Sequence, residues 1–217
     1  NVSANDTMNN LSVFLDWNSS LVSWWRMDDL NASGGVVDYM MRNNGTAMGN
    51  SFQVTSGYFG KGFKFADDGY IRTPFQFDGM TQYTFSLWGK RRETNGLIYA
   101  AEGTGGADKI QIGWWINGSV FISNAEDEYH TEYNKSGWMH AVITFDGSLS
   151  PDTAKTKVYI DGVDQGASLN TALTSVPVLG QTFYIGLRNY SNGIYTNGTI
   201  DDVMIFNRSL SAEEVAA

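Results

Sequence analysis

Oxygen-bearing side chains that could bind a cation lie near both ends of the sequence. They are Asp28, Asp29, Asp38, Asn44, Asp201 and Asp202. Calcium takes roughly six to eight oxygens from carboxylates, amide carbonyls and the backbone, so these residues are candidate ligands of one structural calcium ion. In the alternative interpretation, Asp38 and Asn44 are turn residues, and one aspartate of each adjacent pair points into solvent.

The stretch AEDEYHTEY, residues 125–133, holds the candidate catalytic carboxylates. In an extended strand its alternate residues share one face, and these are Glu126, Glu128, His130 and Glu132. Two carboxylates roughly 5–10 Å apart can cleave a glycosidic bond. An acidic strand in solvent explains the pattern equally well, no Ser-His-Asp grouping is visible, and GTGGADK lacks the spacing of a phosphate-binding loop. We therefore expect no enzyme.

Aromatic side chains are the candidate sugar-binding residues, because exposed rings stack on sugar faces. The candidates are Trp114, Trp115, Tyr129, Tyr133, Tyr190 and Tyr195. Since Trp114 and Trp115 are adjacent on a predicted strand, one should point to the core and the other outward. Trp24, Trp25, Trp88 and Trp138 are assigned to packing.

The acceptor pattern Asn-x-Ser/Thr occurs eleven times, against about three expected from composition. The sites are Asn1, Asn5, Asn10, Asn18, Asn31, Asn44, Asn117, Asn134, Asn189, Asn197 and Asn207. Three of them are Asn-Gly pairs that also suit hairpin turns, which leaves eight that turn chemistry does not explain. The excess predicts covalent N-glycans, and hence an extracellular or cell-surface protein.

Composition narrows the class of protein and of partner. The 217 residues contain no cysteine, so disulfides and cysteine-based zinc sites are excluded. Many sequons without cysteine favour an archaeal-type surface protein over a secreted eukaryotic one. A net charge of −9 argues against nucleic acid and anionic membranes as partners, and no apolar run is long enough to insert into a bilayer. We expect the chain to be a piece of a longer polypeptide.

Short apolar runs separated by turn residues predict an all-β, two-sheet antiparallel jelly-roll sandwich over residues 21–217. WWINGSVFIS predicts a hairpin with an Asn-Gly turn, and SLSAEEV predicts one short helix capped by Ser211. Residues 1–20 are read as an arm or linker. Within them, residues 11–17 alternate apolar and polar side chains and predict a strand that could pair with another copy of the chain.

The motifs LVSWWRMDDLN, VVDYMMRNNGT, GYFGKGFKFADDGYIRTP, YTFSLWGK, GWMHAVITFDG, KVYIDGVDQG and GTIDDVMIFNRSLSAEEV follow one another in the sequence. In this order they resemble the laminin G-like, concanavalin A-like lectin/glucanase superfamily found in prokaryotic and archaeal surface proteins. The resemblance implies that the first and last strands are neighbours, with a structural calcium ion near their junction. It also implies a Glu-x-Asp-x-x-Glu signature for catalytic members, which AEDEYHTEY lacks.

Three functions follow from these patterns. The leading one is a non-catalytic, heavily glycosylated structural or adhesion module at a cell surface, which could assemble into a layer or filament through residues 11–17. The alternative is a calcium-assisted lectin that binds polysaccharide or glycoprotein. A polysaccharide hydrolase is the remote third.

Overall fold

The structure, a computed structural model, describes residues 20–92, 98–102, 109–115, 119–125, 127–133, 135–167, 169, 172–178, 180–189 and 193–216. The predicted strand at 11–17 and the sites Asn1, Asn5, Asn10, Asn18, Asn117 and Asn134 lie outside these residues. No helix among the described residues is long and apolar enough to cross a membrane.

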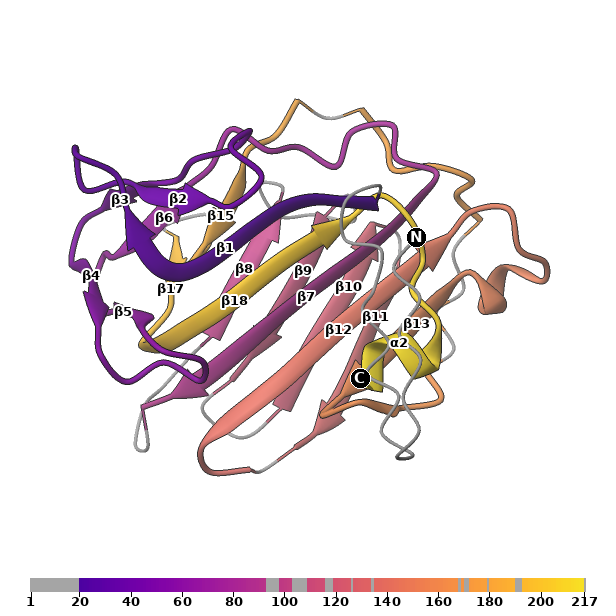
Figure 1. Ribbon diagram of the computed structural model, residues 1–217. Helices are drawn as coiled ribbons and strands as arrows, with labels where there is room; N and C mark the ends of the chain where they lie inside the picture. The colour runs from indigo at the N-terminus through magenta and orange to yellow at the C-terminus, as the bar shows by residue number, and fades with distance from the viewer. Residues whose placement is uncertain are drawn as a thin grey trace, which may run out of the picture.

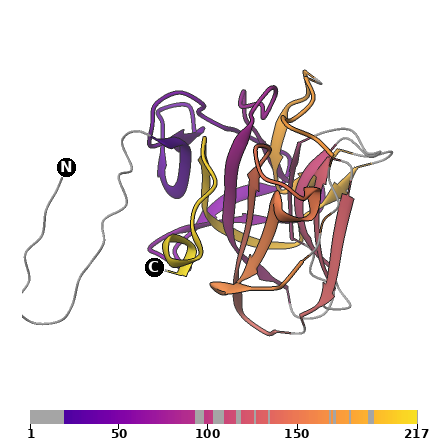
Figure 2. The same ribbon diagram turned by 90° about the vertical axis from the view of Figure 1, so that its right-hand side faces the viewer.

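The protein is a sandwich of two large antiparallel sheets, as predicted (Figures 1 and 2). Sheet A has the order β14 (Val163–Asp164), β13 (Thr156–Ile160), β12 (Trp138–Asp146), β7 (Gln82–Arg91), β18 (Gly198–Phe206), β1 (Leu21–Leu30) and β2 (Val36–Asp38). Off this path, β5 (Gly62–Phe65) pairs with β18 and with β4 (Ser51–Val54).

Sheet B has the order β11 (Asp127–Glu132), β10 (Ser119–Ala125), β9 (Lys109–Trp114), β8 (Ile98–Glu102), β15 (Phe183–Ile185), β6 (Tyr70–Arg72) and β3 (Thr46–Met48). A small ribbon pairs β16 (Leu187–Arg188) with β17 (Ile194–Tyr195). The predicted hairpin is confirmed as β9–β10, in which Trp114 pairs with Val120. The first and last strands, β1 and β18, are neighbours as the resemblance implied.

The core lies between the two sheets because alternate residues of each strand point inward. Its largest members are fully buried aromatic rings, among them Trp25, Phe63, Phe65, Tyr83, Phe85, Trp114, Phe145 and Phe183. This alternation leaves the opposite face of sheet A free to carry other side chains.

A second, smaller apolar cluster lies on that opposite face, hereafter the outer face of sheet A. It consists of Leu21, Val142, Tyr159, Phe206, Leu210 and Val215. The C-terminal helix α2 (Ala212–Ala216) covers it, and a 3₁₀ turn, η1 (Asp152–Ala154), precedes β13. The predicted cap is confirmed: Ser211 Oγ accepts the N–H of Glu214 at 3.3 Å, and the Glu214 carboxylate accepts the N–H of Ser211 at 2.9 Å.

Candidate functional site

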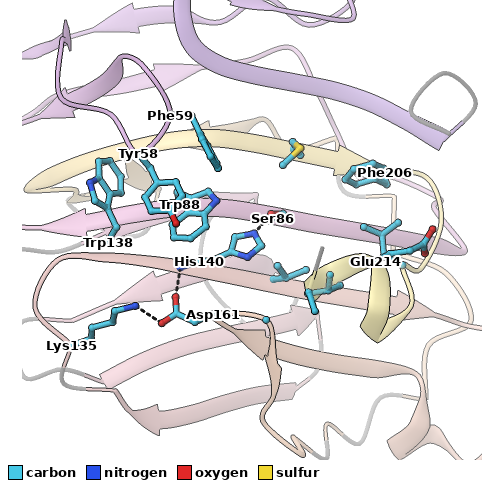
Figure 3. Close-up of a pocket in the computed structure, with 16 residues that line it drawn as sticks. Tyr58, Phe59, Ser86, Trp88, Lys135, Trp138, His140, Asp161, Phe206 and Glu214 are labelled. Carbon is cyan, nitrogen blue, oxygen red and sulfur yellow. Dashed lines mark hydrogen bonds and ion pairs between the residues drawn. The ribbon is translucent and has the colours of Figure 1, made fainter. Parts of the chain in front are cut away.

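A depression of about 610 Å³ opens on the outer face of sheet A (Figure 3). Strands β7, β12 and β18 form its floor, the loop at residues 55–61 lies at one end, and α2 lies at the other. We call it the aromatic trough, and its defining side chains are Tyr58, Phe59, Trp88, Trp138 and His140.

Strand alternation explains why these side chains face outward. On β7, Phe85 and Leu87 enter the core, so Ser86 and Trp88 project from the other face. The same alternation on β12 buries Met139 and Ala141 in the core and turns Trp138 and His140 outward. Because Trp88 and His140 are directly paired across the two strands, their rings meet.

Three rings are stacked on one another in the trough. Trp88 stacks on His140 with ring centroids 4.8 Å apart and on Tyr58 at 3.4 Å, both nearly parallel. The edge of Trp138 approaches Tyr58 at 6.0 Å. Phe59 is 57% exposed and Tyr58 is 42% exposed, so the trough offers apolar ring surface to solvent.

The loop that carries Tyr58 and Phe59 is held by a buried carboxylate of β18. Asp201 Oδ2 accepts the backbone N–H groups of Tyr58 at 2.7 Å and of Phe59 at 2.9 Å. A side chain at Gly57 would place its Cβ 2.7 Å from the same oxygen, so only glycine lets the loop come this close. Asp201 therefore positions the exposed rings of the trough.

His140 is a neutral polar group at the floor. Its Nε2 lies 2.8 Å from Ser86 Oγ, and burial lowers the pKa of His140 to about 4 despite the nearby charge of Asp161. This places a serine, a histidine and an aspartate close together, which the sequence did not reveal. Asp161, however, accepts the backbone N–H of His140 at 2.9 Å.

Asp161 also forms the polar rim of the trough. Its Oδ2 accepts hydrogen bonds from Tyr133 Oη and from Lys135 Nζ, each at 2.5 Å. Burial alone would raise the pKa of Asp161, but the hydrogen bonds from Lys135, Tyr133 and the His140 N–H lower it. The hydrogen bond to Asp161, followed by burial, raises the pKa of Tyr133 to about 12. The rim is thus a paired, locally neutral network at physiological pH.

Most of the sugar-binding candidates from the sequence lie elsewhere. Trp114 is fully buried in the core, so it is not a stacking platform, and Trp115 is half-buried after β9. Tyr129 packs against the core and Tyr195 lies near Tyr70. Of the candidates within the described residues, Tyr133 alone approaches the trough, through Asp161. Tyr190 lies outside the described residues.

The candidate catalytic stretch forms the edge strand β11. Glu128, His130 and Glu132 are exposed on one face of it, and His130 Nε2 lies 3.6 Å from a Glu128 oxygen. Glu126 lies outside the described residues. The trough is on the other sheet, so these carboxylates do not line it.

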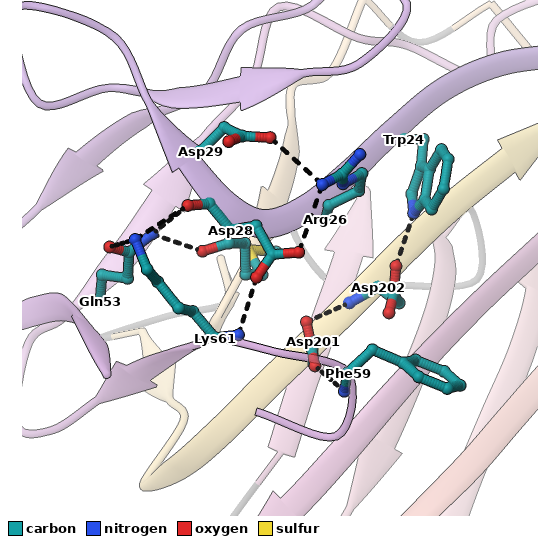
Figure 4. Close-up of polar contacts among 10 residues, drawn as sticks. Trp24, Arg26, Asp28, Asp29, Gln53, Phe59, Lys61, Asp201 and Asp202 are labelled. Atoms are coloured by element: carbon teal, nitrogen blue, oxygen red, sulfur yellow. Dashed lines mark hydrogen bonds and ion pairs between the residues drawn. The ribbon is translucent and has the colours of Figure 1, made fainter. Parts of the chain in front are cut away.

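The aspartates proposed to bind calcium fall into two groups. Asp28, Asp201 and Asp202 lie around the β1–β18 junction (Figure 4), with Asp29 exposed beside Arg26 at 3.6 Å. Asp38 and Asn44 instead organise the turn after β2. The two carboxylate oxygens of Asp38 accept four backbone N–H groups, and Asn44 Oδ1 accepts the N–H of Asp38 at 2.9 Å.

Each of the three aspartates at the junction already accepts at least one N–H group. Asp202 Oδ1 accepts Trp24 Nε1–H at 2.6 Å, and Asp28 Oδ1 accepts the N–H of Lys61 at 2.7 Å. Among the described residues no three His, Asp or Glu side chains gather as a metal site. In this arrangement the residues do not fit calcium, which stays a prediction from the sequence.

Burial raises the pKa values of the two adjacent aspartates, Asp201 and Asp202. Asp201 is fully buried and Asp202 is 5% exposed. Burial raises the pKa of Asp201 to about 7 and that of Asp202 to about 6. The charge of Asp202 adds to the effect on Asp201, and that of Asp28 to the effect on Asp202.

Five predicted glycosylation sites lie in the described part of the chain. Asn31, Asn44 and Asn207 are exposed, and Asn189 and Asn197 are half-buried. Asn31 Oδ1 accepts hydrogen bonds from the N–H and the hydroxyl of Ser33, its own sequon partner. Covalent N-glycans stay a prediction.

Reasoning from the sequence missed most of the trough. Trp25, Trp88 and Trp138 were all assigned to packing. This is correct for Trp25, which is fully buried, but Trp88 and Trp138 are half-buried and line the trough. Outward residues of YTFSLWGK and GWMHAVITF could have been selected by alternation alone. Tyr58 and Phe59 reach the trough because their backbone N–H groups bind Asp201, which lies more than 140 residues away in the sequence. No local sequence pattern reveals such a contact.

Comparisons with known structures identify the same fold. Domain 4 of AbnA, an extracellular GH43 arabinanase from Geobacillus stearothermophilus in complex with arabinotriose, superposes with a TM-score of 0.67 at 20% identity, over 90% of this chain and 96% of that one. A sialidase from Trypanosoma rangeli in complex with sialic acid superposes with a TM-score of 0.65 at 18% identity. The match covers 90% of this chain but only 32% of the sialidase.

A third similar structure is the binding domain of Botulinum neurotoxin DC in complex with rat synaptotagmin II, with a TM-score of 0.62 at 17% identity over 91% of this chain and 49% of that one. At these identities the likeness concerns the fold. No curated protein matches the sequence significantly. The family model described as "Concanavalin A-like lectin/glucanases superfamily" matches residues 64–216, more than half of the sequence, so the chain belongs to this superfamily.

Proposed function

We propose that this domain is a non-catalytic carbohydrate-binding module of an extracellular protein and that the aromatic trough is its binding site. The observation that carries the proposal is the row of rings formed by Tyr58, Trp88 and His140, flanked by the exposed Phe59. Sugar rings present apolar C–H faces to aromatic side chains and hydroxyls to polar ones. The trough supplies both kinds of group within one depression.

The polar groups of the trough suit hydroxyl recognition. Neutral His140 and the Asp161 network can each exchange hydrogen bonds with sugar hydroxyls at the floor and rim. At the other end, Glu214 is paired with Arg208 through two hydrogen bonds of 2.6 and 2.7 Å. Both carboxylates of the trough are therefore balanced by cations, so they do not repel a ligand.

The same geometry favours binding over catalysis. A histidine whose pKa is about 4 is a weak general base near neutral pH, and Ser86 is only 4% exposed. The exposed carboxylates of β11 lie on the other sheet. The arabinanase and neurotoxin neighbours, whose domains are described with arabinotriose and with a protein partner, also support a binding role.

The extracellular, surface-displayed and glycosylated character is part of the proposal. It is supported by the eleven sequons and by the exposure of Asn31, Asn44 and Asn207. A structural or adhesion role at a surface, the leading function from the sequence, is compatible with glycan binding because adhesion by a lectin-like module proceeds through sugars.

The test is a calorimetric titration of the purified domain with neutral arabino- and gluco-oligosaccharides. We expect saturable binding that is weakened by Phe59→Ala and by Trp138→Ala, since each removes ring surface from the trough. Tyr39→Ala is the matched control, because Tyr39 is 55% exposed and does not line the trough.

Binding that survives both trough variants unchanged would move the site elsewhere. The absence of binding to neutral and acidic glycans alike would overturn the proposed function. Circular dichroism of each variant separates loss of a contact from loss of the fold.

A further inference from the structure

A second depression, of about 560 Å³, adjoins the aromatic trough on the outer face of sheet A. We call it the basic depression, because its lining contains the cationic side chains of Lys64, Lys90, Arg91 and Arg92. Its nine described lining residues include no carboxylate. The whole chain has only 14 Lys and Arg against 23 Asp and Glu, so this concentration of positive charge runs against the composition.

Strand pairing places the basic depression next to the trough. Thr199 on β18 pairs with Lys64 on β5 and with Lys90 on β7. Lys90 in turn pairs directly with Trp138 on β12, and directly paired residues project from the same face about 5 Å apart. One row across four strands thus runs from a lysine, over a threonine hydroxyl and a second lysine, to a tryptophan of the trough.

The two lysines of this row and the neighbouring Arg92 are available to a ligand. Among the described residues, no carboxylate forms an ion pair with Lys64, Lys90 or Arg92. Lys64 and Lys90 are exposed, and the ammonium of Lys64 lies 5.8 Å from the ring of Phe52. The charges of the trough are paired, so the described side chains that line this end of the site add a net positive charge.

We infer that the natural ligand is an acidic saccharide, with its sugar rings on the aromatic trough and its anionic groups on the basic depression. This inference rests on the proposed function and specifies its ligand class. Spanning four strands, the row is roughly 14 Å long, which accommodates a short oligosaccharide and not a single ring. Thr199 would donate to a hydroxyl or an anionic oxygen midway.

The sequon at Asn197 bears on the same site, because Asn197 lines the basic depression and Thr199 is its third residue. A glycan attached there would cover the cations. The experiment therefore uses protein from a host that does not add N-glycans.

The test compares four probes at matched ionic strength: polygalacturonate, dextran sulfate, neutral arabinan and polyglutamate. We expect both acidic polysaccharides to bind more tightly than arabinan, with affinity that falls as salt is added. The first two separate carboxylate from sulfate ligands. Binding of polyglutamate as tight as that of the acidic polysaccharides would overturn the saccharide assignment and favour an acidic protein partner.

Two triple variants then locate the charge. Replacing Lys64, Lys90 and Arg92 by Gln should lower the affinity for acidic polysaccharides roughly tenfold, because three exposed charge pairs are lost. The affinity for arabinan should not change. Replacing Arg42, Arg72 and Lys157, which are exposed and do not line the site, makes the same change in net charge and should have little effect.

The outcomes distinguish the two proposals. Equal affinity for neutral and acidic glycans overturns the acidic ligand, and equal loss in both triple variants overturns its placement on the basic depression. The carbohydrate-binding function stands in either case. Loss of acidic binding in the first triple variant but not in Trp138→Ala overturns the joint site, since the cations would then act without the trough.

Discussion

Asp201 and Tyr58, which are 143 residues apart in the sequence, are joined by a hydrogen bond of 2.7 Å from the Tyr58 N–H to Asp201 Oδ2. The same oxygen accepts the Phe59 N–H, and Asp201 Oδ1 accepts the N–H of Asp202 at 2.9 Å. A carboxylate that no ligand would touch thus sets the position of the most exposed rings of the trough.

Asp201→Ala should therefore impair both stability and glycan binding. The variant leaves three backbone N–H groups without their acceptor, which we expect to lower the free energy of unfolding by about 2–3 kcal/mol. Chemical denaturation measures this loss, and the glycan titration measures the effect of a loosened Tyr58. Glu132→Ala, at an exposed position of the edge strand β11, is the control and should change stability by less than about 0.5 kcal/mol. Equal stability of the two variants would show that Asp201 does not anchor the loop.

The raised pKa values of Asp201 and Asp202 predict that stability falls as pH rises. A carboxyl whose pKa is higher in the folded than in the unfolded chain contributes stability that is complete below about pH 4. This contribution is lost as pH rises through about 6 for Asp202 and about 7 for Asp201. His140, whose pKa is lowered to about 4, acts in the opposite direction over part of this range.

Asp202→Asn isolates the effect, because His140 is present in both proteins. The amide can still accept the Trp24 Nε1–H but carries no charge to bury. Between pH 5.0 and pH 7.5 the variant should gain roughly 1.4 kcal/mol of stability relative to the natural protein, the equivalent of about one pKa unit. Denaturant unfolding at the two pH values gives this difference, and an unchanged difference would show that Asp202 titrates normally.

The calcium prediction can be tested on the same aspartates. The oxygens of Asp28, Asp201 and Asp202 already accept N–H groups, so we expect millimolar calcium or a chelator to leave the unfolding temperature unchanged at pH 7.5. A rise of several degrees with calcium, absent from Asp202→Asn, would instead establish the site predicted from the sequence, because binding to the folded state alone stabilises it.

Local pattern was sufficient to predict the sandwich, the β9–β10 hairpin and the cap of α2. In each case the deciding interactions lie within a few residues, such as Ser211 with Glu214. The pairing of β1 with β18 came from resemblance, since contacts that link the ends of a chain leave no periodic signal.

The site was harder to predict from the sequence than the fold, because its residues come from different strands and loops. Asp38 and Asn44 have the residue types of calcium ligands, yet their oxygens hold a turn. Trp88 and Trp138 were judged by composition, whereas their outward position follows from the register of β7 and β12. Lys90 drew no attention in the sequence, because only the pairing of strands places it beside Thr199 and Trp138.

Sequon occupancy in protein from the native source should follow exposure in the described part of the chain. Asn31, Asn44 and Asn207 are exposed, and their side chains can carry a glycan without displacing core residues. Asn197 is half-buried beside the basic depression, and a glycan there would block the acidic ligand. We therefore expect glycopeptide mass spectrometry to find sugar at the three exposed sites and little at Asn197. Full occupancy of Asn197 in protein that still binds acidic polysaccharide would contradict the placement of that ligand, and bare peptides at all three exposed sites would remove the main support for an extracellular glycoprotein.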